Sequence, residues 1–202
     1  MRKTVYSCLL AILLLVLAVP AFADGGTLSM YVAYGKPELI ASEFEKASGI
    51  KVEFLPMSSG EVLTRLKAEQ ANPRTDIWFG GGSDAFIQAK EDGLLLPYVS
   101  PNAERVKEAF KDTEGYWTAV SVVVVGLLAN TERLASKGLP VPQTWAELAD
   151  PAFENEVIAS NPRTSGTAYT SISGMLQLLG EEKGWAYLDA LYANVPFLEK
   201  SG

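Results

Sequence analysis

Several short turns of the chain join hydroxyl side chains to glycine just before a stretch with helical spacing of apolar residues. The turn at 161–170 reads Asn-Pro-Arg-Thr-Ser-Gly-Thr-Ala-Tyr-Thr, with Ser165, Gly166 and Thr167 at its centre. The first N–H groups of a helix lack partners within it, and the helix dipole makes that end positive. Such a turn suits an anion, although a single one is more typical of an ordinary helix cap.

The same design occurs at three earlier points, and this repetition favours anion binding over simple capping. The candidate binding residues there are Tyr34 and Gly35 in the first turn, Ser59 and Gly60 in the second, and Gly81, Gly82 and Ser83 in the third. Three successive glycines offer no side chains for packing and cost conformational entropy on folding. Their presence indicates that another group approaches the backbone closely at this point. Lys36 is a candidate point charge, whereas Arg163 is more typical of a solvated loop.

The elements that carry these turns alternate between strand and helix. Strands are predicted at 27–33, 50–55 and 76–79, and each is followed by a turn and an amphipathic helix. This order predicts an α/β fold with a parallel sheet and helices on its faces. In such sheets ligands bind beyond the carboxyl ends of the strands, where all these turns lie. Trp78, within the third strand, is expected in the core.

The second half of the chain predicts fewer strands. A surface helix is expected at 101–110, and a β-branched apolar run at 118–129 reads as a crossover between two domains or as a long buried strand. One further strand, 156–160, is too little for a sheet of usual size, so the second domain is either small and helical or incomplete. We favour the second interpretation and expect a partial second domain and a fragment of a longer protein. The predicted division is a first lobe at 24–118, a hinge strand at 119–126 and a partial second lobe at 127–202.

The first 23 residues have the features of a cleavable export signal. Arg2 and Lys3 precede the apolar run 9–19, and Ala21-Phe22-Ala23 fits a cleavage site. We therefore expect an exported, soluble protein without a membrane span. Removal of this segment takes away Cys8, the only cysteine, and moves the formal net charge from −7 to −9. That charge argues against nucleic acid as a partner.

The residue types present restrict the possible chemistry. The chain has no histidine, which excludes Ser-His-Asp catalysis, Cys-His catalysis and histidine metal ligands. A hydrolase or lyase would need two convergent carboxylates, and Glu38, Glu61 and Asp84 lie at the turns. Each of them reads more simply as an acid that complements the positive end of its helix. No enzyme activity and no cofactor are therefore expected.

The order of motifs resembles a known family. The phrases are Ser-Ser-Gly-Glu (58–61), Asp-Ile-Trp-Phe-Gly-Gly (76–81), Gly-Leu-Leu-Leu-Pro-Tyr (93–98), Pro-Gln-Thr-Trp-Ala-Glu-Leu-Ala-Asp-Pro (142–151) and the turn at 161–170. Together they resemble the periplasmic substrate-binding proteins of ABC importers, in the ferric-iron-binding-like branch, over the whole mature chain. The resemblance implies a type II fold of two α/β lobes with hinge strands, the ligand between the lobes, and an ABC permease as partner.

The family's metal ligands are missing from the corresponding turns. Iron-binding members use a histidine after the first strand and an acidic residue after the third, where this chain has Lys36 and Gly81-Gly82. We therefore expect no metal, and a monomeric receptor for a small anion such as a phosphonate or a sugar phosphate. Ferric iron binding remains the first alternative, and a periplasmic hydrolase or lyase the second.

Overall fold

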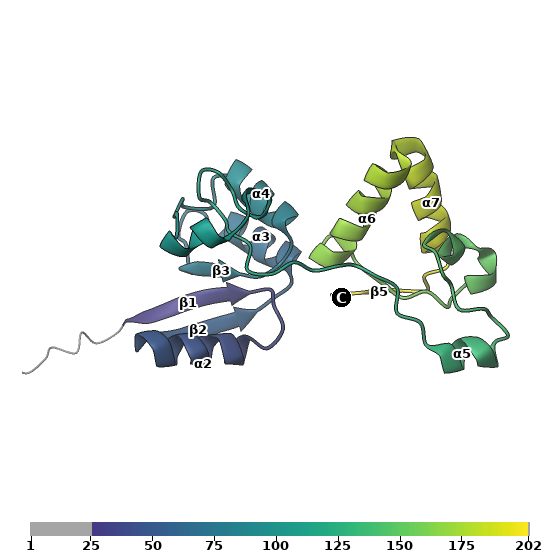
Figure 1. The fold of residues 1–202 in the computed structure, drawn as a ribbon, viewed down its shortest axis with the longest axis horizontal. Coiled ribbons are helices and arrows are strands. Elements are labelled where there is room, and N and C mark those ends of the chain that lie inside the picture. Colours follow the sequence, from purple (N-terminus) through teal and green to yellow (C-terminus); the bar gives the residue numbers. More distant parts are fainter. Residues whose placement is uncertain (1–25, 202) are drawn as a thin grey trace, which may run out of the picture.

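The computed structural model describes residues 26–201, so the predicted export signal lies outside the described part of the chain. Figure 1 shows two groups of elements joined by an extended connection. The first group contains β1 (Thr27–Val32), α2 (Pro37–Ser48), β2 (Lys51–Pro56), α3 (Ser59–Ala68), β3 (Ile77–Phe79) and α4 (Ser83–Glu91). The predicted alternation of strand, turn and helix is confirmed in this group.

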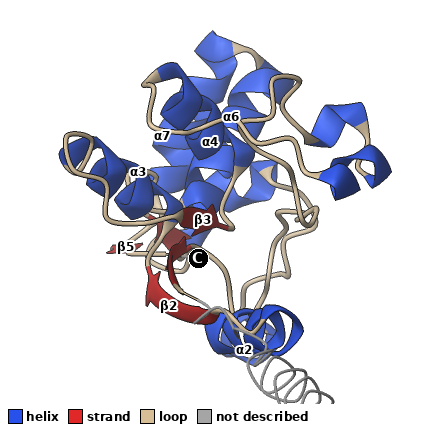
Figure 2. Ribbon diagram, turned by 90° about the vertical axis from the view of Figure 1, so that its left-hand side faces the viewer, coloured by secondary structure: helices blue, strands red, loops and turns tan. Residues whose placement is uncertain are grey.

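The three strands of this group form one parallel sheet in the order β2-β1-β3. Thr27 pairs with Lys51, and Met30 pairs with Ile77. In Figures 1 and 2, α2 lies on one side of the sheet, while α3 and α4 lie on the other. Because the strands are parallel, their carboxyl ends and the turns that follow them meet at one edge. The predicted α/β class is thus confirmed.

Burial explains why these elements pack as they do. Val32 in the central strand is 1% exposed and belongs to a core cluster with Met30, Ala41 and Val52. A central parallel strand is covered on both faces, which agrees with the burial of three consecutive residues, Met30, Tyr31 and Val32, at 5%, 5% and 1% exposed. On the opposite side of the sheet, Val62 of α3 is fully buried.

Local signals set the helix boundaries next to the turns. Pro37 begins α2, and Gly49 ends it in the left-handed region with φ 74°. At the start of α3, the Glu61 carboxylate accepts hydrogen bonds from the Ser58 N–H at 3.0 Å and the Ser58 hydroxyl at 2.8 Å. The capping arrangement fixes where α3 begins and therefore where its unpaired N–H groups point.

The prediction of a single helix at 101–110 is wrong. The structure has two short 3₁₀ helices instead, η1 (Pro101–Arg105) and η2 (Glu108–Phe110). Beyond them the chain doubles back, with the Asp112 N–H donating to the Trp117 carbonyl and the Ala119 N–H to the Phe110 carbonyl. Only Ala103 is buried in the two helices, so no continuous apolar face stabilises a longer one.

The strand predicted at 119–126 is also absent, as is the alternative of a long buried strand. Residues 119–130 have no regular structure and form part of the connection between the two groups in Figure 1. Val120, Val123 and Val124 are 65%, 74% and 88% exposed. A strand needs a neighbour to bond with, and none of the described strands pairs with this segment.

The second group follows the connection. It contains α5 (Thr131–Ser136), η3 (Ala146–Ala149), η4 (Pro151–Phe153), β4 (Ala159–Ser160), α6 (Gly166–Leu179), α7 (Glu181–Ala193) and β5 (Leu198–Glu199). The strand predicted at 156–160 is shortened to β4, which pairs in parallel with β5, a strand the sequence did not predict. Within residues 26–201, no helix has the length and apolar character needed to cross a membrane.

Candidate functional site

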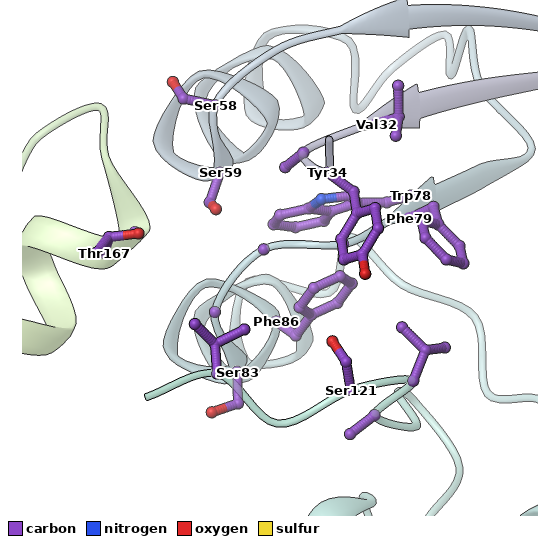
Figure 3. Close-up of a pocket in the computed structure, with 18 of the residues that line it drawn as sticks. Val32, Tyr34, Ser58, Ser59, Trp78, Phe79, Ser83, Phe86, Ser121 and Thr167 are labelled. Carbon is purple, nitrogen blue, oxygen red and sulfur yellow. The ribbon is translucent and has the colours of Figure 1, made fainter. Parts of the chain in front are cut away.

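A cavity of about 840 Å³ lies beyond the carboxyl ends of the first sheet and takes residues from both groups. This volume falls within the range typical of small-molecule sites. Nine of the ten predicted binding residues line it: Tyr34, Gly35, Ser59, Gly81, Gly82, Ser83, Ser165, Gly166 and Thr167. In Figure 3, Ser59 and Ser83 lie on one side, and Thr167 approaches from the other. The structure therefore brings the four predicted turns together.

Gly60 is the exception among the predicted residues, since it does not line the cavity. Its N–H donates to the carbonyl of Thr164 at 3.0 Å, across the two groups. A Cβ built on Gly60 would lie 2.3 Å from the carbonyl oxygen of Arg163. The physical reason for glycine here is thus contact between the two groups, and the Gly60 N–H has Thr164 as its acceptor.

Ser59 lies where three turns meet. The residue is 6% exposed, and its hydroxyl makes no hydrogen bond to another residue within 26–201. A Cβ built on Gly81 would lie 2.6 Å from Ser59 Oγ, and one built on Gly166 would lie 2.8 Å away. Only glycine at both positions lets the turns approach this closely, so that the Ser59 hydroxyl lies at the meeting point of the three turns.

Ser165 combines a capping role with its place in the cavity. The residue is 2% exposed, and its Oγ accepts a hydrogen bond from the Ala168 N–H at 3.3 Å, which caps α6. Because the oxygen is the acceptor, the hydroxyl proton is left to donate to a ligand.

We expect Ser165→Ala to lower the free energy of unfolding by about 1 kcal/mol through loss of the cap. It should also weaken ligand binding through loss of the donor, by about five-fold. Urea unfolding and calorimetric titration measure the two effects. Ser171→Ala on the same helix is the matched control, because it removes a hydroxyl outside the cavity that donates to the Thr167 carbonyl at 2.8 Å. If Ser165→Ala and Ser171→Ala bind ligand equally well, the Ser165 hydroxyl is not a contact.

Aromatic rings form one wall of the cavity, which sequence reasoning largely missed. Trp78 stacks on Phe86 with ring centroids 4.1 Å apart, and Tyr34 meets Phe79 edge to face at 5.7 Å. Figure 3 shows these rings below the start of α3, with Tyr34 directed toward Ser121. The expectation of a core position for Trp78 overlooked its place in β3 beside the glycine turn, which was the signal that it lies near the site.

The residue that supplies positive charge to the cavity also differs from the one expected. Neither Lys36 nor Arg163 lines it, whereas Lys200 does. Lys200 Nζ lies 2.7 Å from Glu61 Oε1, and this contact, with the Ser58 hydrogen bonds, lowers the pKa of Glu61 to about 2. The sequence does not reveal Lys200 as a site residue because it does not predict β5, so the position of Lys200 at the end of a strand is not visible.

The arrangement suits binding more readily than acid–base catalysis. Of Glu38, Glu61 and Asp84, only Glu61 lines the cavity, and it is paired with Lys200. Within residues 26–201, no group of three or more His, Cys, Asp or Glu side chains is placed to hold a metal ion. Hydroxyl groups and helix N-termini dominate the polar lining, and these are donors for an oxygen-rich anion.

Comparison with known proteins places this architecture in a family. Residues 72–202 match the family described as "Bacterial extracellular solute-binding protein". The solved periplasmic binding protein AfuA of Actinobacillus pleuropneumoniae, with fructose 6-phosphate bound, is 37% identical with a TM-score of 0.84. The match covers 88% of this chain and 58% of that one.

Curated relatives extend the similarity. An uncharacterized protein of Haemophilus influenzae is 36% identical over 170 residues, 82% of this chain and 49% of the relative. A protein of Sinorhizobium fredii, y4fP, named as a candidate ABC transporter periplasmic-binding protein, is 27% identical over 198 residues, 95% of this chain and 54% of the relative. The chain thus spans about half the length of these relatives.

Relatives with other named ligands are more distant. A protein of Salmonella typhimurium named as a candidate 2-aminoethylphosphonate-binding periplasmic protein is 29% identical over 156 residues, 75% of this chain and 42% of the relative. Iron-bound HitA of Pseudomonas aeruginosa, at 21% identity and a TM-score of 0.67 over 86% of this chain and 56% of that one, shares the fold. The family match and the type II fold together confirm the resemblance seen in the sequence: this chain belongs to the bacterial extracellular solute-binding proteins.

Proposed function

We propose that this chain is the solute-binding component of an ABC importer and captures a small phosphoryl-containing anion, such as a sugar phosphate or a phosphonate. The observation that carries the proposal is the meeting of the starts of α3, α4 and α6 around one cavity. Each helix start offers unpaired N–H groups and a positive dipole end. A phosphoryl group needs several donors at once, and these three turns supply them from both sides.

The aromatic wall supports a ligand with a body as well as an anionic head. The rings of Tyr34, Trp78 and Phe86 offer apolar surface opposite the hydroxyl-rich turns. A sugar phosphate has both an apolar ring face and a phosphoryl group. That AfuA is solved with fructose 6-phosphate supports this ligand class, and the phosphonate-binding name of a more distant relative supports the anionic head.

The parts of the chain have separate roles in this function. Residues 24–118 and 127–202 act as two lobes, and the connection 119–126 acts as the hinge between them. Ligand binding favours the state in which the lobes touch, and that closed form is presented to an inner-membrane permease. Residues 1–23 direct export to the periplasm, and the exported protein works as a monomer without enzymatic activity.

A thermal-shift screen of the full-length protein tests the ligand class. The ligands are fructose 6-phosphate, 2-aminoethylphosphonate, inorganic phosphate and ferric citrate, with unphosphorylated fructose as the matched control. At about 100 times the dissociation constant, a ligand stabilises by about 2.7 kcal/mol, which raises Tm by about 5–10 °C. We expect this rise with at least one phosphoryl compound and none with fructose. Stabilisation by the ferric salt alone would overturn the proposal.

A further inference from the structure

Lys200 belongs to a ring of contacts that links the two groups of elements. The Gly60 N–H donates to the Thr164 carbonyl at 3.0 Å, and the Thr164 hydroxyl donates to the Lys200 carbonyl at 2.6 Å. The ring closes where Lys200 Nζ meets Glu61 Oε1 at 2.7 Å. Both the backbone and the ammonium group of Lys200 are therefore held by neighbours at the edge of the cavity.

The ammonium group retains binding capacity in this position. A lysine ammonium group has three N–H donors and Glu61 Oε1 accepts one of them, while Glu61 Oε2 is taken by Ser58. The Lys200 side chain is 71% exposed, so its remaining donors are open to a solute that enters the cavity. Among the described residues that line the cavity, Lys200 is the one with a cationic side chain.

The overall charge of the protein makes such a local cation important. With a formal net charge of −7 for the whole chain, the general field repels anions. Helix starts and hydroxyls supply partial charges only, whereas the Lys200 ammonium group supplies a full one, part of which the Glu61 carboxylate at 2.7 Å offsets. A charged donor within reach of the ligand therefore determines how much more tightly the protein binds a phosphorylated solute than the same solute without its phosphoryl group.

We propose that Lys200 is a ligand-contacting, specificity-determining residue whose ammonium group binds the phosphoryl group and thereby selects phosphorylated over unphosphorylated solutes. This inference rests on the proposed function and deepens it. Lys200 directly follows β5 in the second lobe, and its ammonium group is the cation that this lobe adds to the site. When the lobes are in contact, Glu61 of the first lobe and Lys200 of the second lie together, so the charge is in place in the closed state.

Calorimetric titration of the full-length protein with fructose 6-phosphate, or with whichever phosphoryl compound gives the largest thermal shift, tests the inference. Lys200→Met keeps the side-chain length and removes the charge, and Lys200→Arg keeps the charge. Arg163→Met is the matched control, because it removes one positive charge from an exposed residue outside the cavity. We expect a loss of affinity of about ten-fold or more for Lys200→Met and less than about two-fold for Arg163→Met. Lys200→Arg should retain most of the wild-type affinity.

The outcomes separate the inference from the proposed function. If the wild type binds and Lys200→Met matches Arg163→Met, Lys200 is no ligand contact and the inference alone is overturned. If Lys200→Arg loses as much affinity as Lys200→Met, charge is not what Lys200 contributes, which also overturns it. If the wild type binds no phosphoryl compound, the proposed function fails and takes the inference with it. Circular dichroism of each variant confirms that the comparison is between folded proteins.

Discussion

Gly60→Val is expected to weaken ligand binding on the order of a hundred-fold, because it keeps the two lobes apart. A Cβ at this position would lie 2.3 Å from the Arg163 carbonyl oxygen and 3.0 Å from Thr164 Cα. These are backbone atoms that cannot turn aside as a side chain does. The Gly60 N–H would also lose its Thr164 acceptor, and Lys200 would move away from Glu61. Calorimetric titration measures the affinity, and small-angle X-ray scattering should show a larger radius of gyration without ligand.

A second glycine inside a helix provides the control. Gly174 of α6 has no atom within 4 Å of its would-be Cβ, so Gly174→Val makes the same chemical change in open space. Both substitutions replace glycine by a residue of better helix propensity, and α3 should persist in either variant. An unchanged radius of gyration and an unchanged affinity in Gly60→Val would show that the lobe contact at Gly60 does not govern binding.

The first lobe could be predicted closely because its signals are local. The strands are apolar runs or, in the second strand, an alternation of apolar and charged residues, and each turn contains glycine and a hydroxyl. The sequence pattern and the three-dimensional order therefore coincide. The end of α2 has an equally local cause, since Gly49 closes the helix in the left-handed region with φ 74°. Ser59, Gly81 and Gly166 line one cavity because parallel strands carry their turns to one edge.

The mistakes concern segments whose structure depends on distant partners. The apolar run around Val123 has the composition of a strand, but pairing requires a neighbour that no local pattern reveals. Strand β5, only two residues long, is defined by its pairing with β4 and has no periodicity to detect. For the same reason Lys200 is not visible in the sequence as a site residue, and Gly60 is predicted to face the ligand when its partner is Thr164.

Gly80→Ala is expected to lower the free energy of unfolding by about 3 kcal/mol. Gly80 has φ 80°, a conformation that residues with a Cβ rarely adopt. The added methyl would lie 2.7 Å from the Ala33 carbonyl oxygen and 2.7 Å from Tyr34 Cβ. Both neighbours belong to the turn after β1, next to the place where the Ala33 N–H donates to the Phe79 carbonyl at 2.8 Å.

Relief of this clash requires β1 and β3 to separate at their carboxyl ends, which also moves Tyr34 away from Phe79 in the aromatic wall. Gly80→Ala should therefore weaken ligand binding as well as stability, whereas a purely local strain would leave binding unchanged. Gly35→Ala is the matched control, since Gly35 lies in the neighbouring turn, has no positive φ and has no atom within 4 Å of its would-be Cβ. Urea unfolding of the two variants measures the difference. Equal stability would mean that the close approach of the two turns at Gly80 is not needed to hold the binding edge of the sheet together.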